Sequence, residues 1–197
     1  MFTIGITGGS GAGKTSALNA LRSLGVFTLD CDAIYHELLA NDPDLKMELE
    51  ARFAGVLRNG QIDRKHLGEI VFSDPDALLD LNAITHKYIS KEIARRIADA
   101  EHQGFSAVAI DAIALIESGR AEKCDIVVGV TAPKEMRVSR IMARDMITRE
   151  QAETRIGAQK PDSFFEENCD YVVEGIYADP TEFEYKCREF FMKVMEI

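Results

Sequence analysis

One stretch near the start of the chain, residues 5–16 with the sequence GITGGSGAGKTS, limits the fold more than any other. An apolar run, Phe2–Thr7, leads into four closely spaced glycines, and a helical pattern, Lys14–Leu24, follows them. A backbone that lacks Cβ atoms can fold closely around an anion and direct its N–H groups toward it. The N-terminus of the following helix adds positive partial charge. The stretch therefore predicts a strand, an anion-binding loop and a helix in succession.

The loop fits the pattern G-x-x-x-x-G-K-[ST] at Gly8, Gly13, Lys14 and Thr15, which is typical of the P-loop that binds nucleotide phosphates. We expect Lys14 to reach the β- and γ-phosphates and the Thr15 hydroxyl to bind Mg²⁺. The alternative is a glycine-rich turn with a surface lysine. The residues predicted to bind ATP in this loop are Gly8, Gly9, Ser10, Gly11, Ala12, Gly13, Lys14, Thr15 and Ser16.

Four further apolar runs resemble strands that are covered on both faces, as in a parallel sheet. They are residues 26–30, 107–113, 125–132 and 170–174. Helical patterns separate them at residues 136–146 and after Pro180, which predicts an α/β fold with a five-stranded parallel sheet flanked by helices. Asp111, near the end of one run, is the predicted second ligand for Mg²⁺, through a coordinated water. A solvated aspartate at a strand end is the alternative.

Residues 33–104 show helical periodicity and no convincing strand, which predicts a mostly helical insertion on the substrate side of a single domain. The core is then expected at about 1–32, 105–133 and 168–197. Between the last two of these core ranges, residues 134–160 include seven basic and four acidic residues, in a chain whose net charge is -10. This segment is a local cationic patch.

The overall negative charge argues against a nucleic-acid partner, because such proteins need a basic footprint. No apolar run approaches the roughly 18 residues of a membrane span, and the first residues lack the pattern of a signal peptide. We therefore expect a cytoplasmic protein with no membrane partner. The four cysteines form no C-x-x-C pair and are expected to be reduced thiols. The oligomeric state stays open.

The absence of an Asn-Lys-x-Asp motif argues against a GTPase and favours a small-molecule kinase. The second run ends in LDCDAIYHELL, with Asp30 and Asp32 two residues apart. Because carboxyl ends of parallel strands open on the crevice where ligands bind, Asp32 is the predicted base that accepts a proton from the acceptor hydroxyl. Helix capping is the alternative for this pair.

Several motifs occur together in a characteristic order: the loop, DCDAIYH, FAGVLRNGQIDRKHLGEIVFSD, ITH at 84–86, RIMARD and RIGAQ. With them the chain resembles the dephospho-coenzyme A kinase family over nearly its whole length. The resemblance implies a P-loop NTPase fold with a helical CoA-side domain and a lid at about 134–167. It also implies ATP and Mg²⁺ as cofactors and dephospho-CoA as the small-molecule substrate, phosphorylated on its ribose 3'-hydroxyl in the last step of coenzyme A synthesis.

The resemblance assigns roles residue by residue. Asp32, Lys14, Arg140 and Arg144 match catalytic positions, and Arg140 also binds ATP. The implied substrate-binding residues are Thr7, Asp32, His86, Leu115 and Arg155, while Gln159 matches a lid position and Tyr35 and His36 are weaker candidates. Arg140 and Arg144 are four apart and so share a helix face. Solvated helix charges are the alternative for the arginines, and a structural histidine for His86.

The sequence also departs from the family. Residues 113–117 read IALIE where the family has PLLFE, and Lys87, Phe165 and Gly175 replace proline, lysine and asparagine. These changes lie at the acceptor wall and the lid, so two alternatives remain. One is another small-molecule kinase, similar to shikimate kinase, and the other is a noncatalytic nucleotide-binding protein.

Overall fold

The structure is a computed structural model that describes residues 1–196. The chain forms two compact units, one of Met1–Leu29 with the residues from Ala100 onward and the other of Asp30–Asp99. The helical insertion expected at 33–104 overlaps the second unit. Its role as a substrate subdomain stays a prediction.

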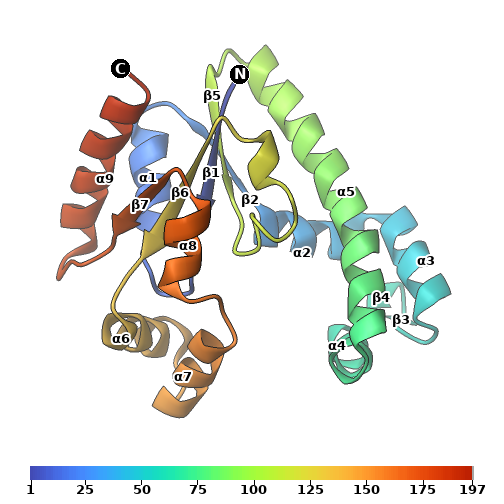
Figure 1. The fold of residues 1–197 in the computed structure, drawn as a ribbon. Coiled ribbons are helices and arrows are strands. Elements are labelled where there is room, and N and C mark those ends of the chain that lie inside the picture. Colours follow the sequence, from blue (N-terminus) through green and yellow to red (C-terminus); the bar gives the residue numbers. More distant parts are fainter. Residues whose placement is uncertain (197) are drawn as a thin grey trace. The chain divides into compact units, whose positions relative to one another are not determined.

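A parallel sheet forms the centre of the first unit, with its five strands in the order β2-β5-β1-β6-β7 (Figure 1). The strands are β1 (Phe2–Thr7), β2 (Phe27–Asp30), β5 (Ala107–Asp111), β6 (Ile126–Thr131) and β7 (Tyr171–Glu174). This confirms the predicted α/β class. Because β1 is the middle strand, the loop that follows it starts at the middle of the sheet's carboxyl edge.

Both faces of the inner strands are covered, as the apolar runs predicted, but this prediction is wrong for the edge strand β7, where Tyr171 and Val172 are exposed. Ile4, Ile6 and Val128 on one face share a buried core with Phe183 and Phe191. Helix α1 (Lys14–Ser23) and helix α9 (Pro180–Val194) lie side by side there (Figure 1). Strand side chains alternate between faces, so Gly5 and Gly129 belong to the opposite face.

On that opposite face, large side chains pack against the two glycines. The side chain of Leu115 lies against Gly5, and that of Phe165, from α8 (Asp162–Asn168), lies against Gly129. The remaining elements of this unit are the short 3-10 helix η1 (Ala121–Lys123), α6 (Lys134–Asp145) and α7 (Arg149–Gly157). Val138, Ile141 and Ala152 form a small separate core between α6 and α7.

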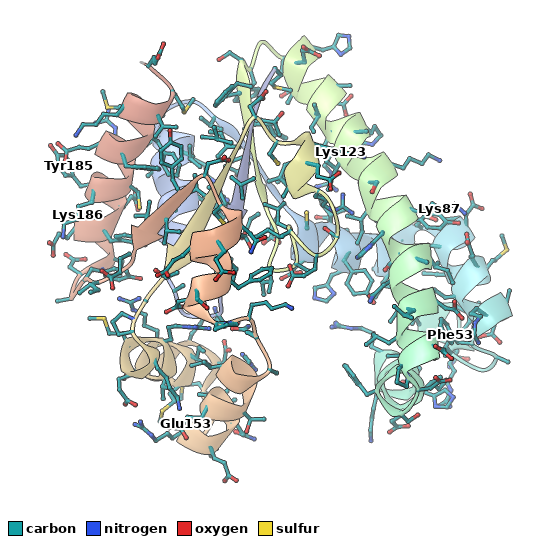
Figure 2. All side chains as sticks on the ribbon, in the orientation of Figure 1. Phe53, Lys87, Lys123, Glu153, Tyr185 and Lys186 are labelled. Carbon is teal, nitrogen blue, oxygen red and sulfur yellow. The ribbon has the colours of Figure 1, made fainter. Side chains whose placement is uncertain are left out.

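The second unit contains α2 (Cys31–Asn41), α3 (Pro43–Arg52), α4 (Arg64–Ser73) and most of α5 (Pro75–His102). Phe53, the residue after α3, is 2% exposed in the core of this unit, and Lys87 on α5 pairs with Glu48 at 2.8 Å. Phe53 and Lys87 are labelled in Figure 2. The buried apolar residues of this unit are Leu39, Leu45, Leu49, Phe53, Val56, Ile62, Leu67, Val71 and Ala77. Helix α5 has 28 residues but carries too many charged side chains to cross a membrane. Within residues 1–196, no helix is both long and apolar enough to span a bilayer.

The expectation that residues 33–104 contain no strand is wrong. Leu57–Arg58 (β3) and Gln61–Ile62 (β4) pair in an antiparallel hairpin. Asn59 and Gly60 form the turn, with φ of 51° and 77°. Asn-Gly is a strong signal for such a two-residue turn, because both residues tolerate positive φ. The signal was present in the sequence, but strands of two residues are too short to show periodicity.

Substitution of Glu92 is expected to weaken the second unit in a pH-dependent way. A hydrogen bond from Arg95, aided by one from Arg96, lowers the pKa of Glu92 from 4.5 to about 2. Since the folded pKa is depressed, the stabilisation is complete above pH 4.5 and is lost as the pH falls toward 2. Because these ion pairs are partly exposed to solvent, the stabilisation that Glu92 contributes is limited to about 1 kcal/mol.

Glu92→Gln should therefore lower the free energy of unfolding by about this amount at pH 6, and the difference from the natural protein should shrink on acidification. Urea unfolding between pH 6 and pH 3, followed by circular dichroism, measures both. Glu122→Gln, at an exposed glutamate, is the control. If the difference in free energy of unfolding between Glu92→Gln and the natural protein stays constant with pH, the lowered pKa of Glu92 is contradicted.

Candidate active site

The glycine-rich loop joins the end of β1 to the start of α1 as the sequence predicted. Gly8, Gly11 and Gly13 have φ of 139°, 76° and 118°, a region that other residues rarely adopt. A Cβ on Gly8 would lie 2.1 Å from the carbonyl oxygen of Val130. The loop therefore packs so closely on the backbone of β6 that only glycine fits at position 8.

Lys14 and Ser16 begin α1 at the end of this loop. The Lys14 ammonium donates a hydrogen bond to the carbonyl oxygen of Gly8 at 2.8 Å, so it lies over the loop. Ser16 is buried, and its N–H donates to the carbonyl oxygen of Gly13 at 3.0 Å. The Lys14 ammonium and the N-terminus of α1 therefore both lie at the loop.

Thr15 and Asp111 are the predicted Mg²⁺ ligands. Thr15 is exposed in the first turn of α1, and Asp111 ends β5, where it pairs in register with Ile6 of β1. One carboxylate oxygen of Asp111 is buried. Within residues 1–196 no three His, Cys, Asp or Glu side chains are grouped as a metal site. A hydroxyl and one carboxylate nevertheless fit Mg²⁺, which takes oxygen ligands and retains waters and phosphate oxygens.

Thr7 and Leu115 are both buried in the first unit. The Thr7 hydroxyl donates to the carbonyl oxygen of Ile113 at 3.1 Å, which ties the end of β1 to the segment after β5. Leu115 is 0% exposed and packs on Gly5. This placement favours a packing role for Leu115, and its contact with substrate stays a prediction.

Arg140 is the predicted lid arginine that the structure brings to the loop. Its guanidinium donates to the carbonyl oxygens of Gly11 at 3.1 Å, Gly175 at 2.9 Å and Tyr177 at 3.3 Å. It also lies 3.7 Å from the centroid of the Tyr177 ring, and that ring stacks on Phe183. Arg140 therefore joins the loop to the segment after β7, and its roles in ATP binding and catalysis stay predictions.

Arg144 and Arg155 converge on Asp145 instead. Arg144 donates to both carboxylate oxygens of Asp145 at 2.7 and 2.9 Å, and Arg155 donates to the second oxygen. The hydrogen bond from Arg144 is the largest cause that lowers the pKa of Asp145 to about 2. Both arginines are exposed. Four-residue spacing thus did not give Arg140 and Arg144 the same partners, and a catalytic role for Arg144 and substrate binding by Arg155 stay predictions.

Asp30 and Asp32 differ in their local roles within the second unit. The Asp30 carboxylate caps α2, accepting from the N–H groups of Asp32 at 2.9 Å and Ala33 at 3.0 Å. Asp32 is exposed in the first turn. Capping is therefore the role of Asp30, and the role of Asp32 as a base stays a prediction.

The three candidate aromatic residues also lie in the second unit. Tyr35 is half-buried, and burial raises its pKa while the nearby charge of Arg64 opposes this. His36, beside Tyr35, is exposed. His86 is half-buried in α5. Substrate binding by these residues stays a prediction.

Gly175 stands where the resembling family has asparagine, and the structure gives the reason for glycine. A Cβ at this position would lie 2.1 Å from the carbonyl oxygen of Ala12 in the loop. The N–H of Gly175 also donates to the carbonyl oxygen of Thr131 at 2.7 Å. The segment after β7 therefore packs directly on the phosphate loop, which leaves no room for a side chain.

Sequence reasoning missed Arg137 as part of the site. It was counted only within the cationic patch, yet its side chain is buried and contacts the loop at Ser10. Its position three residues before Arg140 on one helix face was a usable signal. Gln159, which the resemblance assigned to the lid, contacts Ser10 as well.

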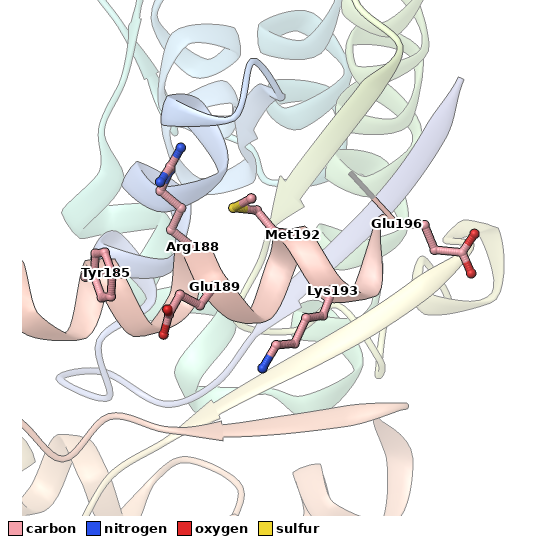
Figure 3. Close-up of a pocket in the computed structure, with 6 residues that line it drawn as sticks. All are labelled: Tyr185, Arg188, Glu189, Met192, Lys193 and Glu196. Carbon is pink, nitrogen blue, oxygen red and sulfur yellow. The ribbon is translucent and has the colours of Figure 1, made fainter.

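A separate surface hollow of about 500 Å³ runs along α9 (Figure 3). Among the described residues, its lining comes from this helix and from Glu196, which follows it. Arg188, Glu189 and Lys193 are exposed there, so both signs of charge are present. It shares no residue with the predicted site.

The fold and the loop define a class of protein, the P-loop NTPase fold, in which a strand, a glycine-rich loop and a helix meet at the carboxyl edge of a parallel sheet. The sequence model described as "Dephospho-CoA kinase" matches residues 2–176. A dephospho-CoA kinase of Dehalococcoides mccartyi is 39% identical over 165 residues, 83% of each chain. The chain belongs to the dephospho-CoA kinase family, which confirms the resemblance seen in the sequence.

Solved structures that resemble this one include two kinases. Dephospho-CoA kinase from Campylobacter jejuni has a TM-score of 0.69 and 25% identity, with 98% of this chain and 96% of that chain covered. Shikimate kinase from Bacteroides thetaiotaomicron has a TM-score of 0.58 and 15% identity, with 100% and 99% covered. The second likeness shows the shared fold alone.

The predicted activity as an ATP-dependent kinase is confirmed by the family to which the chain belongs.

Proposed function

We propose that this chain transfers the γ-phosphoryl group of ATP to the ribose 3'-hydroxyl of dephospho-CoA, giving coenzyme A and ADP. The observation that carries this proposal is the family match over residues 2–176, because it covers the phosphate loop and the helical unit together. The loop geometry supports the nucleotide half. The relatives' activity supports the choice of acceptor.

In this proposal, the loop from Gly8 to Ser16 holds the phosphates through backbone N–H groups, and Lys14 stabilises the charge on the transferring group. Asp32 accepts the proton of the 3'-hydroxyl while the oxygen of that hydroxyl forms a bond to the γ-phosphorus. The bond between the γ-phosphorus and the oxygen that bridges it to the β-phosphate breaks, and ADP leaves. Arg140, whose guanidinium donates to the Gly11 carbonyl oxygen of the loop at 3.1 Å, would add positive charge beside the bound phosphates. The Thr15 hydroxyl and, through a coordinated water, Asp111 would hold Mg²⁺, which would supply positive charge to offset that of the phosphates.

A cytoplasmic location belongs to the same proposal, since an ATP-dependent kinase needs a supply of ATP. Dephospho-CoA remains the only partner proposed. The shikimate-kinase-like fold is compatible with a different alcohol as acceptor, and the altered residues 113–117 are the part of the sequence that favours testing one.

The test is direct formation of coenzyme A. Purified protein, ATP, Mg²⁺ and dephospho-CoA are incubated, and coenzyme A and ADP are quantified by liquid chromatography. We expect equal amounts of both products and no ADP with the 3'-deoxy analogue of dephospho-CoA. ADP formation only with shikimate would favour the other kinase, and tight ATP binding without turnover of either acceptor would favour a noncatalytic protein.

A further inference from the structure

The Gly9–Ser10 part of the phosphate loop is held by two side chains that are distant in sequence. Arg137, in the first turn of α6, donates from Nε to the carbonyl oxygen of Ser10 at 3.0 Å. Gln159, just after α7, accepts from the Ser10 N–H at 2.9 Å and donates from its amide to the Ser10 hydroxyl at 2.8 Å. Every polar group of Ser10 therefore has a partner in this pair.

Arg137 and Gln159 also bind each other. The Nη2 group of Arg137 donates to the side-chain oxygen of Gln159 at 2.7 Å, and the same oxygen accepts the Ser10 N–H. The three residues form a closed hydrogen-bonded network. A fixed guanidinium orients the carboxamide of Gln159, and the carboxamide in turn orients the Ser10 peptide.

The energetic setting makes this network costly to break. Arg137 is 4% exposed, and desolvation lowers the pKa of its guanidinium. The Asp162 carboxylate, 3.6 Å from Nη1, partly offsets that cost. A buried charge is retained only where hydrogen bonds compensate for lost hydration, so removal of the donors would leave Ser10 and Gln159 short of partners.

Packing ties the same guanidinium to the neighbouring glycine. A Cβ on Gly9 would lie 2.1 Å from Nη2 of Arg137, so the guanidinium lies directly against this peptide. The position of the Gly9–Ser10 backbone thus depends on where the Arg137 side chain is held. This backbone is part of the loop that the proposed function uses to bind phosphate.

We propose that Arg137 is a positioning residue, which acts through the Ser10 peptide and Gln159 to set the loop geometry that receives the phosphates of ATP. The proposal rests on the proposed function for its catalytic consequence. It has a second consequence for the segment at 134–167. Because Arg137 in α6 and Gln159 after α7 both bind the loop, any lid movement is confined to residues 138–158, which lie between these two contacts.

The test compares Arg137→Met, Gln159→Leu and the double variant, with Arg149→Met as the matched control. Met retains much of the arginine's apolar stem and removes the donors. Arg149, on α7, makes exposed ion pairs with Glu135 and with Glu153, which is labelled in Figure 2, so its loss should leave ATP binding within twofold. ATP affinity is measured by calorimetry, and the thermal midpoint checks folding.

We expect Arg137→Met to weaken ATP binding about tenfold or more, since it removes hydrogen bonds made by a charged donor. The Michaelis constant for dephospho-CoA should stay within about twofold. The loss of ATP affinity in the double variant should be much smaller than the product of the two single fold losses, because both residues act on the same peptide. Arg137→Lys should recover part of the affinity, because an ammonium can still donate to the Ser10 carbonyl.

A folded Arg137→Met variant that binds ATP as the natural protein does would overturn the proposal, as would single effects that simply multiply. If Arg137→Met fails to fold, Gln159→Leu and Arg137→Lys decide, with unchanged ATP affinity in both counting against it. Failure of the proposed function is seen separately, because the natural protein would then bind ATP and form no coenzyme A.

Discussion

Lys14→Ala is expected to reduce phosphoryl transfer by about 10³-fold or more while the protein remains folded. The ammonium lies over the loop, bonded to the carbonyl oxygen of Gly8 at 2.8 Å. A cation at this point stabilises the charge that spreads over the transferring oxygens, and alanine removes it without altering the glycines that shape the loop. The measurement is the rate of coenzyme A formation at saturating ATP and dephospho-CoA.

Lys160→Ala is the matched control for Lys14→Ala. Lys160 is an exposed lysine of the cationic patch at 134–160, with its ammonium 5.0 Å from the ring centroid of Phe164. Its removal changes the net charge equally and should alter turnover less than twofold. Comparable losses in the two variants would mean that general electrostatics, rather than the position of Lys14, controls the rate.

The parts of this fold that could be predicted from sequence are those with a local cause. The run Phe2–Thr7 became β1 with the same bounds, because apolar β-branched residues before a glycine cluster leave few alternatives. Helix α9 begins at Pro180 as expected, since proline suits the first helical position. The 59–60 turn also has a local cause and was missed because its strands are only two residues long.

The parts that could not be predicted depend on partners far away in the chain. The spacing of Arg140 and Arg144 is local, but Arg144 binds its neighbour Asp145 while Arg140 reaches carbonyl groups more than thirty residues away on both sides. Gly175 has the same origin, because the carbonyl oxygen that excludes its side chain belongs to Ala12. Periodicity and propensity do not carry such information.

Asp32→Asn is expected to slow turnover by about 10² to 10⁴-fold and to leave ATP binding nearly unchanged, which is the usual effect of removing a general base. Asparagine has the same shape as aspartate but cannot accept the hydroxyl proton. Asp32 is exposed in the first turn of α2, and its N–H is bonded to Asp30. The substitution therefore removes the carboxylate without disturbing a packed side chain. Single-turnover kinetics and calorimetry with ATP measure the two effects.

Asp30→Asn provides the internal comparison for Asp32, two residues away. The Asp30 carboxylate accepts two N–H groups at the start of α2, and asparagine is an equally good N-cap, so this variant should retain both stability and rate. A base must lose its function on amidation, whereas a cap need not. A rate loss in Asp30→Asn with normal turnover in Asp32→Asn would therefore transfer the proton-accepting role to Asp30, and normal turnover in both would remove it from this strand end altogether.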